Sequence, residues 1–321
     1  MCHERSEIMV GIYRMEYGFV LPKSINSDDL CHFAQKVEEF GFGSIWASDH
    51  VVLPIDQTSQ YPYTADGRFT SGPYDPQLDP LILLSFVGSA TTKVKIGTSV
   101  IIVPYRNPIV QAKMLATLDV LSAGRLVCGI GVGWLEEEFD ALGASYFDRG
   151  SVTDEYLQIF KALWNSDRPE FHGEHYQFSG IGFEPKPIQK PLPIWVGGHT
   201  RRAVRRTVKY GNAWHPTRQS PEYVISMIPY IQRVCEELGR SPKEITVSLK
   251  RTLYLTDIGL DLSARIQSGA ALINTTQKVV DDVRKCEESG IDQLTFDFPT
   301  NNVDECIAIM EHFGNEVSRL L

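Results

Sequence analysis

Short apolar runs alternate with amphipathic segments along most of the chain. The most regular example lies at 94–138, where an apolar, β-branched run (94–102) precedes a helical pattern (108–121) and a second apolar run (126–130). Continuous apolar runs are typical of buried parallel strands, and the intervening apolar residues recur on one helical face. Parallel strands require such a crossover, so this segment predicts a strand–helix–strand unit.

The same alternation predicts eight strands separated by helices. The strands are expected at 8–13, 44–47, 94–102, 126–130, 193–196, 211–215, 245–255 and 293–298. The helices are expected at 80–91, 108–121, 135–142, 148–164, 201–210, 221–238, 276–288 and 303–320, with one more before the second strand. This order predicts a single (β/α)₈ TIM barrel over 1–321, preceded by an extension at 1–7. A doubly wound open sheet is the alternative, but its GxGxxG loop after the first strand is absent.

Three segments interrupt the alternation of strands and helices. The longest, 51–79, is rich in tyrosine and proline and is expected to form a lid over a pocket. A surface excursion without a role is the alternative. The segments at 166–192, with a short hairpin, and 257–275 are further excursions. Loops of this kind carry most substrate contacts. The motifs outside these three excursions therefore do not identify the substrate.

Polar and glycine-rich residues follow several predicted strands, where ligands bind in α/β folds. They are Asp49 and His50 after the second strand, Thr98, Ser99 and Val100 in the third, Gly131 and Gly133 after the fourth, and Gly197, Gly198, His199 and Thr200 after the fifth. Each group also has an ordinary interpretation: a turn or helix cap at 49–50, a buried strand at 97–100, a strand-to-helix turn at 129–133, and a helix start capped by Thr200. The residues alone leave both interpretations open.

Four segments resemble the bacterial luciferase-like monooxygenase family, in particular its coenzyme F420-dependent oxidoreductases. They are GFGSIWASDHVVLP (41–54), IGTSVIIVPYRNPIVQAKMLATLDVLSAGRLVCGIGVGWLEEEFDALG (96–143), RGSVTDEYLQIFKALW (149–164) and PIWVGGHTRRAVRRTVKYGNAWHP (193–216). The resemblance extends from the first strand to about residue 220 and implies a luciferase-like TIM barrel. It also implies hydride transfer between coenzyme F420 and a small organic substrate. The alternative within the family is an FMN-dependent monooxygenase that uses reduced flavin and O₂. A flavin or F420 reductase would supply the reduced cofactor.

The resemblance further implies roles for the residues at the strand ends. Asp49 and His50 would be catalytic: Asp49 would hold cofactor groups, and the imidazole of His50 would exchange a proton beside the reacting carbon. A non-proline cis peptide between Ser99 and Val100 would form a bulge behind the cofactor ring. The glycines at 131 and 133 would let a flat ring approach the backbone. The loop at 197–200 would bind the cofactor phosphate at a helix N-terminus, and one of the acids at 136–138 would enter the site.

Composition limits the other classes of function. The chain is 43% hydrophobic and 22% charged, as in globular proteins, and its formal net charge of -9 argues against nucleic-acid binding. Its six cysteines form no CxxC pair, and no signal peptide or long apolar run is present. We therefore expect a cytoplasmic protein without membrane or metal binding that acts on a small molecule. Apolar helix faces outside a barrel would allow a homodimer, which is common in the family.

Two further classes of function compete with a redox enzyme. A degenerate barrel would bind a flavin without turnover, although the family motifs are intact. A metal-dependent barrel hydrolase would need histidine and acidic ligands at several strand ends, and no early HxH pair is present.

Overall fold

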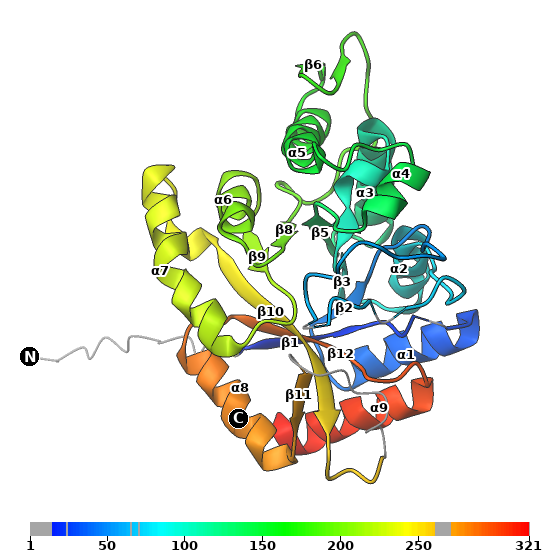
Figure 1. The fold of residues 1–321 in the computed structure, drawn as a ribbon, viewed down its shortest axis with the longest axis vertical. Helices are drawn as coiled ribbons and strands as arrows, with labels where there is room; N and C mark the ends of the chain where they lie inside the picture. Colours follow the sequence, from blue (N-terminus) through cyan, green and yellow to red (C-terminus); the bar gives the residue numbers. More distant parts are fainter. Residues whose placement is uncertain (1–14, 24, 65, 70, 261–270, 321) are drawn as a thin grey trace, which may run out of the picture.

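Parallel strands close into one barrel within the part of the chain that the structure describes. This computed structural model describes residues 15–320, apart from 24, 65, 70 and 261–270. The barrel order is β1, β2, β3, β5, β8, β9, β10 and β12, and β12 pairs with β1 to close it (Figure 1). The strands are β1 (Glu16–Val20), β2 (Ser44–Ala47), β3 (Lys95–Thr98), β5 (Leu126–Gly131), β8 (Ile194–Gly197), β9 (Ala213–His215), β10 (Thr246–Leu255) and β12 (Gln293–Asp297). The predicted (β/α)₈ TIM barrel is confirmed.

Helices surround the strands, as the amphipathic segments predict (Figure 1). They are α1 (Ser27–Glu39), α2 (Pro80–Ala90), α3 (Pro108–Leu121), α4 (Glu136–Ala141), α5 (Arg149–Asn165), α6 (Arg201–Tyr210), α7 (Pro221–Glu237), α8 (Thr276–Glu288) and α9 (Val303–His312). Short 3₁₀ turns η1 (Val103–Tyr105) and η2 (Pro242–Glu244) and a π-helical turn η4 (Phe313–Val317) complete the regular structure. Asp79 and Asn107 cap α2 and α3 with their side chains, and each helix has proline in its first turn.

The first barrel strand lies later in the sequence than predicted. The strand expected at 8–13 lies outside the described residues, and Glu16–Val20 occupies the barrel position between β12 and β2. Glycine has a low strand propensity, so Gly18 makes the segment 16–20 look less like a strand than the aliphatic residues near it. The barrel nevertheless requires a glycine at this position. A Cβ atom at Gly18 would lie 2.2 Å from Ser44 Oγ, so packing inside the barrel outweighs intrinsic strand preference there.

Two strand predictions need smaller corrections. The strand expected at 94–102 is divided into β3 and β4 (Ile101–Ile102), because the backbone bulges at Ser99 and Val100. Residues 271–274, expected within an excursion, form β11 (Ala271–Asn274) beside the outer half of β10. The excursion at 166–192 contains the predicted hairpin, formed by β6 (Phe171–His172) and β7 (Gln177–Phe178). The segment 51–79 has no helix or strand among its described residues.

A layer of large aromatic rings fills the barrel below its C-terminal end. The rings of Trp46 and Trp195 lie 4.9 Å apart, and the imidazole of His215 stacks on Trp46 at 5.2 Å. Gly97 makes room for this layer, since a Cβ atom there would lie 2.5 Å from the Trp46 ring. The filled interior leaves only the strand ends open for ligands.

Candidate active site at the C-terminal end of the barrel

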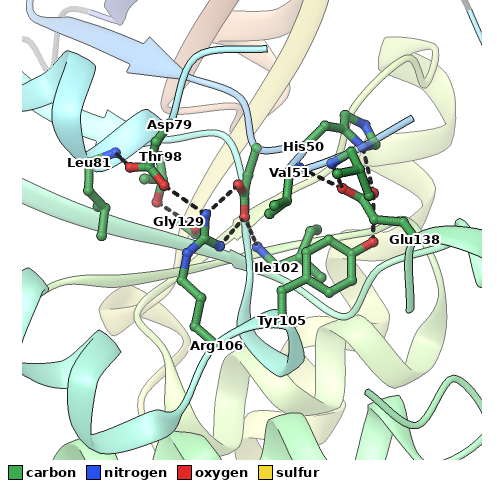
Figure 2. Close-up of polar contacts among 12 residues, drawn as sticks. His50, Val51, Asp79, Leu81, Thr98, Ile102, Tyr105, Arg106, Gly129 and Glu138 are labelled. Atoms are coloured by element: carbon green, nitrogen blue, oxygen red, sulfur yellow. Dashed lines mark hydrogen bonds and ion pairs between the residues drawn. The ribbon is translucent and has the colours of Figure 1, made fainter. Parts of the chain in front are cut away.

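His50 is held in one orientation by a buried carboxylate. Its Nδ1 lies 2.8 Å from Oε2 of Glu138, whose side chain is fully buried, while the His50 side chain is 11% exposed. Glu138 also accepts hydrogen bonds from the backbone N–H groups of Val51 and Val52 and from the hydroxyl of Tyr105 at 2.9 Å (Figure 2). The end of β2 and the start of α4 are therefore joined through one carboxylate.

The protonation state of this pair follows from its surroundings. Burial opposes the charge of Glu138, but hydrogen bonds from His50, Val51 and Tyr105 outweigh burial and lower the pKa of Glu138. Burial, together with the negative Glu138, raises the pKa of Tyr105, which stays a donor. An ionised carboxylate only accepts hydrogen bonds, so Nδ1 of His50 donates. Nε2 of His50 has no hydrogen-bond partner among the described residues and is available to exchange a proton.

Asp49 lies beside His50 but is engaged by other protein groups. Both of its oxygens accept hydrogen bonds from Arg106, at 2.7 and 2.8 Å, and Oδ2 also accepts the backbone N–H of Ile102 at 2.9 Å. Arg106 reaches on to Asp79, the cap of α2, at 3.0 Å (Figure 2). This buried arrangement connects the end of β2, the segment after β4 and the start of α2.

The peptide between Ser99 and Val100 is cis, at the position that the sequence analysis predicted. Its bulge explains the neighbouring glycines in part. A Cβ atom at Gly131 would lie 2.5 Å from the Val100 side chain, and one at Gly197 would lie 2.9 Å from it. Gly133 has φ +85° and faces the ring of Phe139. These glycines therefore admit the bulge and its neighbours, whether or not a ligand also approaches them.

Polar groups support the bulge from below. Ser99 Oγ lies 3.0 Å from Nε2 of His215, whose Nδ1 lies 2.8 Å from Ser248 Oγ. Burial and the nearby charge of Lys250 lower the pKa of His215 to about 3, so this ring is neutral at ordinary pH. The Thr98 hydroxyl donates to the Gly129 carbonyl at 2.6 Å. The neutral ring of His215 therefore connects the hydroxyl groups of Ser99 and Ser248.

Lys250 donates to the carbonyl of Ser99 at 3.3 Å and lies 4.0 Å from Asp297. Burial lowers the pKa of Lys250 to about 8, although Asp297 opposes this shift. Ser48 also donates to the Ser99 carbonyl, at 3.2 Å. The Ser99 carbonyl therefore accepts hydrogen bonds from a residue just after β2 and from one in the middle of β10.

The loop at 197–200 begins α6 in the way that its ordinary interpretation predicts. The Thr200 hydroxyl accepts the backbone N–H of Ala203 at 3.3 Å, and Gly198 has φ +95°. His199 packs on Tyr63 at 5.4 Å, burial lowers its pKa, and its Nδ1 is buried without a hydrogen-bond partner among the described residues. Phosphate binding at this loop stays a prediction.

The aromatic segment 51–79 packs over the strand ends as a lid. Phe69 lies 4.8 Å from the His50 ring, and Tyr61 lies 4.9 Å from the ring of Trp134. Tyr63 covers His199. Glu137 fastens the lid, because one of its oxygens accepts hydrogen bonds from the N–H and hydroxyl of Thr58 and from the N–H of Ser59. Burial opposes the Glu137 charge, but these hydrogen bonds lower its pKa to about 2, so the folded protein keeps this carboxylate ionised until the pH falls to about 2.

Replacing Glu137 by alanine is expected to free the lid. Three hydrogen bonds to a charged acceptor are lost, so trypsin cleavage after Arg68 within the lid should accelerate about 10-fold. Timed digestion followed by mass spectrometry measures the rate. Glu136→Ala is the matched control, since only its backbone N–H contacts the lid, at Ser59 Oγ. Equal acceleration in both variants would show that Glu137 does not fasten the lid.

Several residues of the site are not evident from the sequence. Arg106 and Asp79 flank regular elements, Tyr105 ends the short turn η1, and their partners are 27 to 57 positions away along the chain. Lys250 gives a usable signal, because a lysine inside the apolar run of β10 is rarely buried without a purpose. The interpretation of 136–138 anticipated an acidic residue, and the structure identifies Glu138.

No helix within the described ranges has the length and apolar character needed to cross a bilayer. Groups of three or more metal-ligating side chains are likewise absent from the described part of the chain.

Comparison with known proteins identifies the family. The model of the luciferase-like monooxygenase family matches residues 15–259. An uncharacterised protein of Mycobacterium tuberculosis is 32% identical over 215 residues, which cover 67% of this chain and 74% of that protein. F420-dependent glucose-6-phosphate dehydrogenase of Kineococcus radiotolerans is 30% identical over 229 residues (69% of this chain, 63% of the enzyme). FMNH₂-dependent dimethylsulfone monooxygenase of Pseudomonas putida is 31% identical over 154 residues (47% and 42%).

Solved structures share the same fold. F420-dependent secondary alcohol dehydrogenase, solved with an F420–acetone adduct, superposes with a TM-score of 0.77 over 96% of this chain and 99% of its own, at 18% identity. The match of the family model over most of the barrel, together with relatives above 30% identity, supports the resemblance seen in the sequence. The chain belongs to the luciferase-like monooxygenase family.

Proposed function

We propose that this protein is an oxidoreductase that uses coenzyme F420 for hydride transfer to or from a small organic substrate. The observation that carries the proposal is His50, which Glu138 holds at the strand ends with Nε2 available. Relatives named as F420- and FMNH₂-dependent enzymes support redox chemistry at such a site. An oriented imidazole is the group that oxidation of an alcohol, or reduction of a carbonyl, requires for its proton.

The residues present fit a ring-shaped cofactor at the strand ends. The bulge at Ser99 and Val100 offers a backbone surface, and His199 Nδ1 is a buried nitrogen without a partner among the described residues. A cavity of about 710 Å³ opens next to this surface, beside Ser48 and Lys250, and neither Ser99, Val100 nor His199 lines it. We propose that Thr98, Ser99, Val100, Gly131 and Gly133 lie along the ring, and that Gly197, Gly198, His199 and Thr200 lie along its phosphate-bearing tail.

When bound, F420 would supply the hydride donor or acceptor. Nε2 of His50 would take the proton that a substrate hydroxyl loses on oxidation, or return it on reduction. Glu138 would hold the ring in the correct tautomer and stabilise the imidazolium. Asp49 has both oxygens engaged by Arg106 and Ile102, so we propose that it positions His50 through the shared backbone. The lid would exclude water, and Tyr61 and Phe69 would have to move for a ligand to reach His50.

The second candidate is an FMN-dependent monooxygenase. The family description and the Pseudomonas putida relative favour it, and the same bulge would face the flavin. This function would require a reductase as partner to supply reduced flavin.

Titration separates the two candidates. Oxidised F420 and FMN are added separately to the purified protein, and the quenching of tryptophan fluorescence is followed, since Trp46 and Trp195 lie below the site. The proposal expects micromolar binding of F420 and at least about 10-fold weaker binding of FMN. Preference for FMN would transfer the assignment to the monooxygenase, and binding of neither would contradict both.

We further propose that the protein forms a homodimer through α2 and α3, and that it works in the cytoplasm. The two helices are neighbours, and their outer faces expose Ile82 (57%), Phe86 (47%) and Val110 (55%). Apolar residues this exposed on adjacent helices are typical of interfaces between subunits.

The proposed cytoplasmic location rests on the cysteines. The described cysteines are all free thiols, as in proteins of reducing compartments.

Replacing Phe86 by glutamate is expected to give a monomer, because a charge would be buried in the interface. Light scattering coupled to size-exclusion chromatography measures the mass. Phe147→Glu, at an 84% exposed phenylalanine outside α2 and α3, is the control and should leave the dimer intact. A monomeric wild-type protein, or a Phe86→Glu dimer, would contradict this interface.

A further inference from the structure

The cavity of about 710 Å³ lies next to the proposed site but has a lining of its own. It is formed at the C-terminal ends of β1, β2, β10 and β12, with one wall from the lid segment at 71–78. Its inner end is lined by Ser48 and Lys250, which both donate to the Ser99 carbonyl. A molecule in this cavity would therefore reach the bulge and the residues beside His50.

Positive charge predominates on the cavity wall. Three cations line it, Lys23, Arg218 and Lys250, against two carboxylates, Asp75 and Asp297, which is a formal excess of one positive charge. Asp297 lies 4.0 Å from Lys250, while Asp75 is exposed at the rim and accepts the backbone N–H of Gly72. Burial lowers the pKa of both lysines, and the neighbouring Arg218 adds to that shift. The uncompensated charge favours a monoanionic ligand.

Arg218 is the cation with the least compensation. Its backbone N–H donates to the Lys250 carbonyl at 2.9 Å, and its φ of +54° is unusual for a residue with a side chain. Across the described ranges, no acceptor lies within hydrogen-bond distance of its half-buried guanidinium. A cation that lines a cavity, with its planar donors unused, matches the geometry of a carboxylate.

Apolar and polar side chains share the rest of the lining. Leu21, Leu78, Leu83 and Phe298 form its apolar part. A ligand that consisted of a charged group alone would leave the apolar part of the cavity without contacts. An organic acid with an apolar body would occupy both parts of the cavity.

We propose that the substrate of this site is an organic carboxylate with an apolar body, bound through its carboxylate by Arg218 and Lys23. This inference rests on the proposed function for the reaction, but its binding test does not require turnover. The end of the substrate remote from the carboxylate would then lie toward Ser48 and Lys250. Arg218 and Lys23 are thus specificity-determining residues, distinct from the catalytic His50.

Matched probes test the charge requirement by isothermal titration calorimetry. Benzoate and benzamide have nearly the same shape and differ in charge, and phenyl phosphate carries a dianionic group. We expect benzoate to bind with a dissociation constant of about 1 mM or tighter, and benzamide to bind at least about 10-fold more weakly. Arg218→Asn, which tolerates positive φ, should weaken benzoate binding at least about 10-fold, whereas Arg218→Lys should retain most of it. Arg202→Asn, on the exposed face of α6, is the control and should bind as the wild type does.

The outcomes separate this inference from the proposed function. Equal binding of benzoate and benzamide, no benzoate binding up to about 10 mM, or stronger binding of phenyl phosphate would overturn it. F420 titration of Arg218→Asn should match the wild type. Loss of F420 binding there would show that Arg218 serves the cofactor phosphate and would also overturn the inference. Charge-dependent benzoate binding in a protein that binds neither F420 nor FMN would support the carboxylate site and contradict the proposed function alone.

Discussion

Replacing His50 by alanine is expected to lower kcat by a factor of about 10² to 10⁴ while the affinity for F420 changes by less than about threefold. Nε2 of this imidazole has no hydrogen-bond partner among the described residues, and Glu138 fixes the other nitrogen at 2.8 Å. Turnover is measured by the change in F420 absorbance in a screen of small alcohols, aldehydes and organic acids. The exposed His32 on α1 provides the matched control, and His32→Ala should keep wild-type activity.

Glu138 should act through His50, and its replacement gives a different signature. Glu138→Gln removes the negative charge beside the imidazole, so kcat should fall and its pH profile should move toward lower pH. A structural role alone would leave the pH profile in place. Full activity of His50→Ala with every substrate that the wild type turns over would remove His50 from the mechanism.

Replacing Arg106 by methionine is expected to cost about 3–5 kcal/mol of the free energy of unfolding. Asp49 is fully buried at its side chain, and it would lose two hydrogen bonds and its only cationic partner among the described residues. The melting temperature should therefore fall by roughly 5–15 °C, measured by calorimetry at a fixed scan rate.

Two variants make this prediction specific. Arg205→Met removes an ion pair with Glu237 in which the side chains are 50% and 42% exposed, and it should leave the melting temperature nearly unchanged. The double variant Asp49→Asn with Arg106→Met should recover part of the loss, because no buried charge is then left unpaired. If Arg106→Met destabilises the protein no more than Arg205→Met does, the pair around Asp49 does not stabilise the strand ends.

The sequence predicted the barrel because its signals are local. Apolar runs and helix caps need only neighbouring residues, and α3, α6 and α8 begin and end where the pattern indicates. The family motifs also predicted the cis peptide between Ser99 and Val100 and an acidic residue near the fourth strand. The first strand was misplaced because packing of Gly18 against Ser44 depends on a contact across the barrel.

The remaining parts of the site depend on contacts between distant residues. Arg106 and Asp49 are 57 positions apart, and Lys250 reaches Ser99 across 151 positions. No periodic pattern encodes such pairs. The motif at the glycines 131 and 197 predicted a close approach to the backbone, and the structure shows that the Val100 side chain is one group that approaches them closely. The approach of a cofactor to the same glycines stays a prediction.

A crystal structure of the F420 complex tests the central claim most directly. The account predicts density for the deazaflavin ring over the Ser99–Val100 peptide, beside Nε2 of His50, with Tyr61 and Phe69 displaced from their present contacts. It also predicts that the cavity lined by Arg218 stays open for the substrate. Density for the ring in the cavity lined by Arg218, or a His50 ring that remains covered by Phe69, would contradict the account.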